Sequence, residues 1–179
     1  ERNRVSVTFD VVEGEVSKIR QINMVGNLDF SEEELLDMMK LTTPTFWTWA
    51  TSNDQYSKQK LSADLETLRS FYMDSGYMEF SVNSTQVSIS PDKKDIYITI
   101  NVSEGAKYKV SDIKTLGPEN ILPHEEMRKL IAIEVGDTFS RNKLTEAQKK
   151  ISDRLGDDGY AFANVSAVPE LDKTKHEVA

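Results

Sequence analysis

Short stretches of alternating hydrophobic and polar residues are separated along this chain by stretches of helical spacing. The clearest alternation covers residues 96–104, where apolar side chains occupy every second position. This pattern is typical of a strand buried on one face, and residues 18–26 and 77–89 are also strand-like. Apolar residues recur at helical spacing in 31–39 and 57–75. The predicted order of elements is therefore β-α-α-β-β.

Residues with capping chemistry mark the ends of the predicted helices. Ser31 followed by Glu34 forms a capping-box pattern at the start of the first helix. Ser57 is a candidate N-cap for the second helix. Gly76 stands where a helix C-terminus needs a residue with positive φ.

The same order of elements occurs twice. Gly14 recurs as Gly105, 91 residues later (105 − 14), and Gly76 recurs as Gly159, 83 residues later (159 − 76). The first unit is therefore longer by a net 8 residues (91 − 83). A repeat of this length is a small domain rather than a solenoid turn, so we predict two copies of one module in series.

The second unit repeats each element in a weaker form. A strand-like run at 109–117 is followed by Pro123 and an apolar helical face, and a second helix is expected to begin at Ser140 and to end at Gly159. The linker 104–106 is too short for free rotation, and Gly105 is its most flexible position.

The order of elements also predicts a topology. Two antiparallel helices between the first and second strands return the chain, so the second strand runs opposite to the first. The third strand then lies between them, parallel to the first, and the second strand is left as an edge. Each module is thus predicted to be α+β, with a three-stranded mixed sheet covered by two antiparallel helices.

The second strand of the first unit has an irregular pattern. Phe80 and Val82 are apolar at even positions, whereas Val87 and Ile89 are apolar at odd ones. One extra residue within 83–85 would bring all four side chains to one face, which predicts a β-bulge. The alternative is that Val87 or Ile89 is simply exposed. A bulged edge strand matters because its unpaired backbone groups are open to pairing with another chain.

Composition and charge exclude several functions. The net charge of −8 with dispersed basic residues disfavours binding to nucleic acid or to an anionic membrane. No apolar run approaches the ~20 residues of a membrane helix, so this fragment is not expected to span a membrane. Cysteine is absent, and His124 and His176 cannot form a metal or catalytic site, so we expect no metal, cofactor or catalytic residue. The acidic runs 32–34 and 125–126 are explained by helix starts.

The net excess of the first unit falls in an aromatic segment between its helices. Phe46, Trp47 and Trp49 lie there. They are either an interaction patch, because aromatic anchors dominate interfaces, or a lid over the small core. We favour the lid and keep these three residues as a secondary candidate binding site.

Four segments resemble the POTRA repeats of the BamA family, and the likeness covers essentially the whole chain. They are Gln21–Asn27, Lys58–Tyr72, Ser84–Lys94 and Ile100–Gly105. The first unit is similar to the third of the family's five POTRA domains, and the second, more loosely, to the fourth. By this resemblance residues 1–14 are the last strand of a preceding module, 15–105 a complete module, and 106–179 a C-terminally truncated one.

The resemblance implies a non-enzymatic, periplasmic segment of a Gram-negative outer-membrane protein. Such domains bind accessory lipoproteins, especially the β-propeller one, and guide unfolded β-barrel precursors, by addition of a strand to a sheet edge. A POTRA segment of a related transporter, for two-partner secretion or autotransport assembly, is an alternative, and a hydrolase or metal enzyme is a remote one. Carried onto this chain, the candidate binding residues are Asn83, Ser84, Thr85, Gln86, Val87, Ser88 and Ile89.

Overall fold

Strand β3 (Asp95–Ser103) lies at the centre of the first module because it has a neighbour on each side. Strand β1 (Lys18–Val25) pairs with it in parallel, and β2 (Ser81–Ile89) pairs with it antiparallel. The sheet order β1-β3-β2 and both strand directions confirm the predicted topology.

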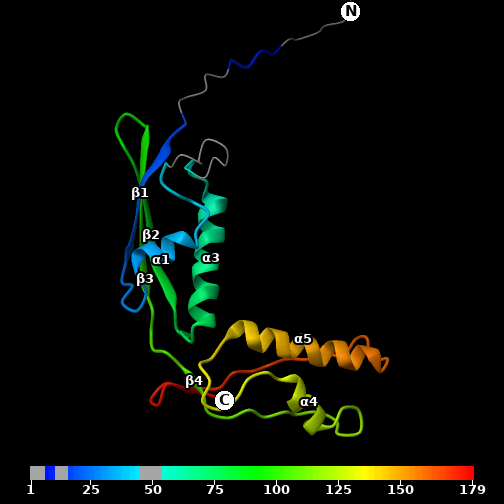
Figure 1. Cartoon of the computed structure of the whole chain (residues 1–179). Helices are drawn as coiled ribbons and strands as arrows, with labels where there is room; N and C mark the ends of the chain where they lie inside the picture. The colour runs from blue at the N-terminus through cyan, green and yellow to red at the C-terminus, as the bar shows by residue number, and fades with distance from the viewer. Residues whose placement is uncertain (1–6, 11–15, 45–53) are drawn as a thin grey trace, which may run out of the picture.

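The computed structural model describes residues 7–10, 16–44 and 54–179 (Figure 1). The aromatic segment with Phe46, Trp47 and Trp49 lies outside these ranges. So does most of the segment 1–14, which the sequence predicts to end a preceding module. Residues 7–10 of that segment have no regular secondary structure, and the assignment of the segment stays a prediction.

In the described part of the first module, two helices cover one face of the sheet (Figure 1). They are α1 (Glu32–Asp37) and α3 (Lys58–Asp74). Ser31 Oγ accepts a hydrogen bond from the Glu34 amide at 3.2 Å, and Ser57 Oγ accepts one from the Lys60 amide at 3.5 Å, so both predicted N-caps are confirmed. The core between helices and sheet is one continuous cluster that includes Ile19, Leu35, Leu68, Tyr72, Ile98 and Ile100.

The second strand of this module begins later than predicted. The pattern placed its start at Tyr77, but residues 77–80 are outside any strand, with a turn at 78–79, and β2 begins at Ser81. The Tyr77 amide bonds back to the Tyr72 carbonyl at 2.9 Å, and the Phe80 amide bonds to the Tyr77 carbonyl at 3.2 Å. These local bonds occupy the backbone groups that a strand would have used.

The second module has the same topology with much shorter strands. Strand β6 (Glu177–Val178) pairs in parallel with β4 (Lys109–Val110) and antiparallel with β5 (Leu171–Asp172). Its helices are α4 (His124–Leu130) and α5 (Arg141–Asp157). The strand predicted at 109–117 thus ends at Val110, because no neighbouring strand accompanies it further.

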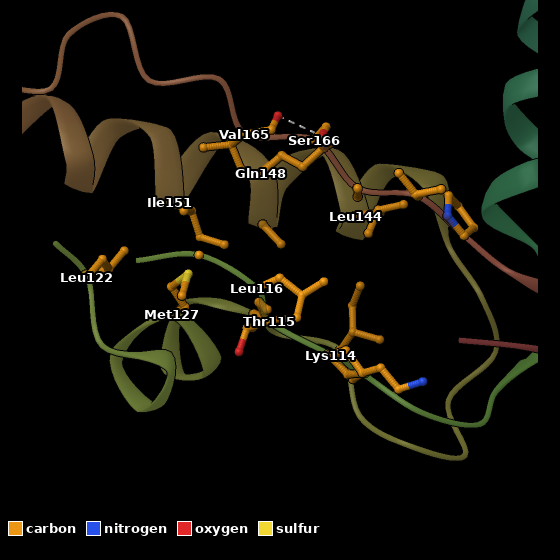
Figure 2. A pocket seen from close by; sticks show the side chains of 18 of the residues that line it. Lys114, Thr115, Leu116, Leu122, Met127, Leu144, Gln148, Ile151, Val165 and Ser166 are labelled. Atoms are coloured by element: carbon orange, nitrogen blue, oxygen red, sulfur yellow. Dashed lines mark hydrogen bonds between the residues drawn. The ribbon is translucent and has the colours of Figure 1, made fainter. Parts of the chain in front are cut away.

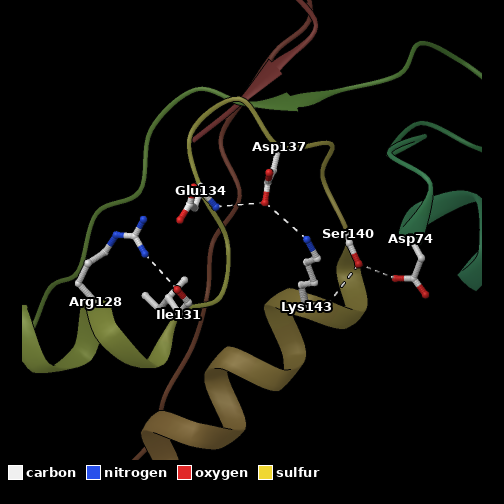
Figure 3. Close-up of polar contacts among 7 residues, drawn as sticks. All are labelled: Asp74, Arg128, Ile131, Glu134, Asp137, Ser140 and Lys143. Atoms are coloured by element: carbon white, nitrogen blue, oxygen red, sulfur yellow. Dashed lines mark hydrogen bonds and ion pairs between the residues drawn. The ribbon is translucent and has the colours of Figure 1, made fainter.

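The two modules meet where α3 ends and α5 begins. The carboxylate of Asp74, the last residue of α3, accepts hydrogen bonds from the Asn142 amide at 2.7 Å and from the Ser140 hydroxyl at 3.4 Å. Figure 3 shows Ser140 directed at Asp74, while Lys143 reaches Asp137 at 3.5 Å. The Tyr108 amide also donates to the Gly76 carbonyl at 2.9 Å. A side chain of the first module therefore caps a helix of the second.

The linker glycine lies in a crowded part of this joint. Gly105 has φ +75°, and a Cβ there would lie 3.0 Å from the Cβ of Glu79. Glu79 accepts a hydrogen bond from the Tyr108 hydroxyl at 2.8 Å and pairs with Lys173 at 2.5 Å. The bond from Lys173 lowers the pKa of Glu79, and the bond from Tyr108 adds to this effect. The joint is thus bridged on more than one side by polar contacts.

Candidate binding edge

Strand β2 contains the β-bulge that the sequence predicts. Its register against β3 is regular from Ile89 to Ser84, then shifts between Ser84 and Val82, so that Asn83 is the extra residue. The bulge falls inside the segment 83–85 that the irregular apolar pattern indicated. The shift is the structural consequence of moving the apolar set from odd to even positions.

The bulge places the apolar side chains of β2 on the helix-covered face. Val87 pairs with Ile98 and Ile89 with Ile96, and directly paired residues share a face of the sheet. Their β3 partners are almost completely buried, whereas Val87 is 37% exposed and Ile89 is 59% exposed. The predicted bulge and its alternative, exposure of Val87 or Ile89, are therefore both present. Val87 and Ile89 are exposed because they lie at the rim of the sheet.

The opposite face of β2 is polar. Ser84, Gln86 and Ser88 pair with Asn101, Thr99 and Tyr97 of β3. The Asn101 side-chain amide donates to Ser84 Oγ at 2.8 Å across this face. One side of the edge thus offers exposed aliphatic groups and the other offers hydroxyls and amides.

The backbone groups that point away from the sheet belong to the apolar positions. The Ser90 amide donates to the Asp95 carbonyl at 2.9 Å, which makes that pair the hydrogen-bonded kind. Because the two kinds of pair alternate along an antiparallel ladder, Thr85, Val87 and Ile89 fall in the other kind. Their amides and carbonyls therefore face outward, on the same residues whose side chains lie at the rim.

The two edges of this sheet differ in whether other segments form hydrogen bonds to their backbone. On β1, the Ile19 amide donates to the Asp54 carbonyl at 2.7 Å, and the Met24 amide donates to a Glu32 carboxylate oxygen at 2.7 Å. Within the described parts of the chain, no backbone–backbone hydrogen bond from another segment reaches the outer edge of β2. The nine residues of β2 also contain no charged residue and no proline, which are two of the usual protections of an exposed edge.

The remaining residues weighed from the sequence do not converge. His124 contacts Glu119 at 3.2 Å, whereas His176 lies against the Tyr108 ring of the joint. Among the residues that the structure describes, no group of three His, Cys, Asp or Glu side chains is arranged to hold a metal ion. Over the same residues, no helix is long and apolar enough to cross a membrane.

One feature of the second module was missed by the sequence reasoning. An apolar cavity of about 660 Å³ lies between α5, α4 and the extended segments 111–117 and 163–170 (Figure 2). Ile151 of α5 and Met127 of α4 point toward each other within it. The available signal was the weak alternation of Val165, Ala167 and Pro169, which is too short to distinguish a strand from a loop.

Comparison with known proteins gives the same two units. The model of the POTRA family, described as a surface antigen variable number repeat, matches residues 17–105 and 108–179. The outer membrane protein assembly factor BamA of Neisseria meningitidis serogroup B is 33% identical over 168 residues, which cover 94% of this chain and 21% of the relative. BamA of Buchnera aphidicola is 36% identical over 178 residues, covering 99% of this chain and 28% of the relative. The chain thus spans about a quarter of the length of these curated relatives.

Solved structures agree with the fold. The crystal structure of POTRA3-5 of Haemophilus influenzae BamA has a TM-score of 0.76 at 24% identity, covering 92% of this chain and 64% of that one. A structure of Haemophilus ducreyi BamA lacking POTRA domains 1-3 has a TM-score of 0.68 at 17% identity, covering 90% of this chain and 28% of that one. At these identities the likeness supports the architecture alone.

Proposed function

The chain belongs to the POTRA family, as two tandem domains homologous to those of BamA, and on that premise we propose that it handles clients and partners in the assembly of outer-membrane β-barrels. In this role it is a non-enzymatic, periplasmic segment of a Gram-negative outer-membrane protein. It binds accessory lipoproteins, above all the β-propeller one, and unfolded barrel precursors. Its modules take the third and fourth POTRA positions, which is tested by whether the parent gene encodes two such domains before them and one after.

The observation that carries the proposal is the outer edge of β2. Thr85, Val87 and Ile89 present their backbone amides and carbonyls outward, and the strand carries no charge or proline to prevent pairing. An extended segment can therefore add to this edge as a fourth strand.

Pairing through the backbone suits a binder of many clients. Backbone hydrogen bonds do not require a particular sequence, whereas the exposed Val87 and Ile89 favour apolar residues at every second position of the added segment. Strands of outer-membrane barrels have that alternation. The affinity should be low, because ordering an extended peptide costs about 1 kcal/mol or more per residue.

The test is an amide-resolved NMR titration of the chain with an unfolded peptide from a barrel strand, and then with the β-propeller lipoprotein. We expect shifts concentrated at residues 83–89. Val87→Pro removes an amide that points outward and leaves the ladder to β3 intact, so it should abolish these shifts in a folded protein. Val87→Thr is the matched control, since it keeps the amide and the β-branched shape and should reduce binding only modestly.

Each other outcome has a definite meaning. Unchanged binding by folded Val87→Pro would reject edge pairing, and amide signals of β3 report whether the variant is folded. Shifts concentrated at 46–49 would move the site to the aromatic segment. The absence of shifts with both ligands would reduce the two modules to a spacer.

A further inference from the structure

The face of the first sheet opposite α1 and α3 is built mainly from uncharged polar side chains. Along β3 the buried residues point toward the helices, so the residues between them point to the opposite face. In the part of the chain that the structure describes, these side chains are exposed or half-buried, so a ligand can reach them. Directly paired residues form three rows across β1, β3 and β2, which we call the open face: Gln21, Tyr97 and Ser88; Asn23, Thr99 and Gln86; Val25, Asn101 and Ser84.

The open face carries no charged residue in its three rows, although 29% of the residues of the chain are charged. Charge begins beside the first row, where Lys18 pairs with Asp95 and where the register shift of β1 passes over Arg20. A charged partner would therefore meet no opposite charge within the open face.

This neutral surface belongs to the first module and is not a feature of the repeat. Val178 of β6 is the counterpart of Ile96 of β3, because each is the first buried residue after a hairpin turn and is paired on both sides. The outward row beside Val178 consists of charged residues only: Lys109, Glu177 and Asp172. The second sheet thus shows charge on its outward side, which is the ordinary composition of a surface exposed to water.

The polar groups of the open face have hydrogen-bonding capacity left for a ligand. The Gln21 side chain donates to Asn23 Oδ1 at 2.7 Å, and this bond fixes two neighbouring amides on β1. Amide and hydroxyl side chains both donate and accept, so each can bond to a ligand of either kind. The side chains of this face that form no hydrogen bond to another described residue are those of Gln86, Ser88, Tyr97 and Thr99.

The composition of the open face narrows the class of ligand. A nucleic acid or an anionic headgroup requires positive charge, which these rows lack. The centre of a protein interface is usually apolar and contains large anchors, whereas this face has a single aromatic ring, Tyr97 at 38% exposure, and a single aliphatic side chain, Val25. These features favour a neutral ligand that is rich in hydrogen-bonding groups.

Carbohydrate has the matching chemistry. A pyranose ring carries hydroxyls around its rim and C–H groups on its face, so the rim can bond to amides and hydroxyls while the face stacks on a tyrosine ring. The rows lie about 6.8 Å apart along a strand and about 4.8 Å across the sheet, so the open face is large enough for a short chain of sugars. An acetamido group on the sugar can exchange paired hydrogen bonds with a side-chain amide, and the open face has four: Gln21, Asn23, Gln86 and Asn101.

We propose that the open face binds a neutral glycan built from N-acetylhexosamine units. Tyr97 stacks on one sugar ring, and the amides of Gln86 and Asn101 in the next two rows bond to the acetamido groups that follow. The affinity is low, because a flat face covers only one side of the ligand, unlike a concave pocket. This inference goes beyond the proposed function, which uses the outward backbone groups of β2 and not this face.

The test is an NMR titration of the chain with the linear tetramer of N-acetylglucosamine. We expect shifts in the side-chain amide signals of Gln86 and Asn101 and in the backbone amides of 97–101. Tyr97→Val removes the ring but keeps a good strand former in β3, and it should weaken binding by about tenfold or more. Tyr160→Val is the matched control, since it removes an exposed ring from the second module and should leave binding unchanged.

A second tetramer tests the role of the acetamido groups. Cellotetraose has the same linkage between glucose units without acetamido groups, and it should bind at least about fivefold more weakly, as for the loss of one hydrogen bond. Equal binding of the two tetramers would overturn the assignment to N-acetylated sugars.

Three further results bear on the open face itself. The proposal would be overturned by the absence of shifts there up to the solubility limit of the N-acetylated tetramer, and equally by undiminished binding to Tyr97→Val. Shifts there with the β-propeller lipoprotein but not with the tetramer would assign the face to a protein instead. The barrel-strand peptide should bind Tyr97→Val as it binds the natural protein, which separates this test from that of the β2 edge.

Discussion

Val87 of β2 has Pro169 as its counterpart in the second module, two residues before β5 begins. Ile89 and Leu171 pair with Ile96 and Val178, which are counterparts, so the residues two before them correspond as well. The first module has an outward-facing amide at this point, and the second has a residue without an amide hydrogen. Proline is tolerated there because no bond to the sheet interior is lost. An outward-facing amide is thus available at this position in the first module and is lacking at its counterpart in the second.

Replacing Pro169 by valine should open the second edge. Pro169→Val restores an outward amide and an aliphatic side chain, so residues 165–170 should acquire shifts in the barrel-strand titration that the natural protein lacks. Binding should stay weaker than at β2, because Glu170 and Asp172 remain beside the site. Identical titrations of the two proteins would show that proline does not control this edge.

A buried carboxylate holds the turn after α1. Asp64 of α3 is 1% exposed, and its two oxygens accept hydrogen bonds from the Lys40 amide at 2.8 Å and the Leu41 amide at 2.9 Å. Asp64→Ala leaves these amides without an acceptor and should lower the free energy of unfolding by about 2–3 kcal/mol. Glu66→Ala, at an exposed site on the same helix, should change it by less than about 0.5 kcal/mol in the same denaturant titration.

The stability of the first module should fall in strongly alkaline solution. Burial raises the pKa of Tyr77 to about 12, and its 2.6 Å hydrogen bond to Asp29 adds to the shift. Burial, followed by a hydrogen bond to Glu104, also raises the pKa of Tyr72. The folded state therefore keeps these protons above pH 10, where the unfolded chain loses them.

The raised pKa of Tyr77 predicts how the stability difference between the natural protein and Tyr77→Phe changes with pH. The contribution of Tyr77 is complete below about pH 10 and is lost as the pH rises to about 12. Tyr77→Phe should be less stable than the natural protein at pH 8, and the gap should narrow between pH 10 and 12 in urea titrations. A gap that stays constant over that range would contradict the assigned cause.

The joint between the modules should loosen when Asp74 is removed. Asp74→Ala deletes the acceptor for the Asn142 amide, so exchange at the start of α5 should become several-fold faster, as for loss of about 1 kcal/mol of capping. Distances between spin labels on α3 and α5 should also spread more widely. Asp153→Ala, on the exposed surface of α5, is the control and should change neither measurement.

Much of this fold could be predicted from local sequence, and the parts that could not depend on distant contacts. The bulge at Asn83 was predictable because period-two alternation is a property of neighbouring residues. The coexistence of the bulge with an exposed Ile89 was not, since the exposure depends on how far the helices extend over the sheet. The correspondence of Val87 with Pro169 required the register of both hairpins, which no spacing in the sequence reveals.

The candidate site follows the same division. The edge position of β2 followed from the order of elements alone, whereas the closure of the β1 edge by Asp54 and Glu32 depends on side chains and loops brought in from elsewhere. The strand predicted over 109–117 is shorter in the structure for a similar reason. An alternating pattern is compatible with a strand, but a strand forms only where a second strand pairs with it.

The cap that Asp74 places on α5 has a mechanical consequence. Figure 1 shows α3 ending where α5 starts, so the two helices share a corner. A turn of the second module about this corner would pull on α3, whose inner face is fixed in the first core through Leu68 and Tyr72. A strand paired with β2 would move with the first module, so its orientation relative to the second module would be set by this joint.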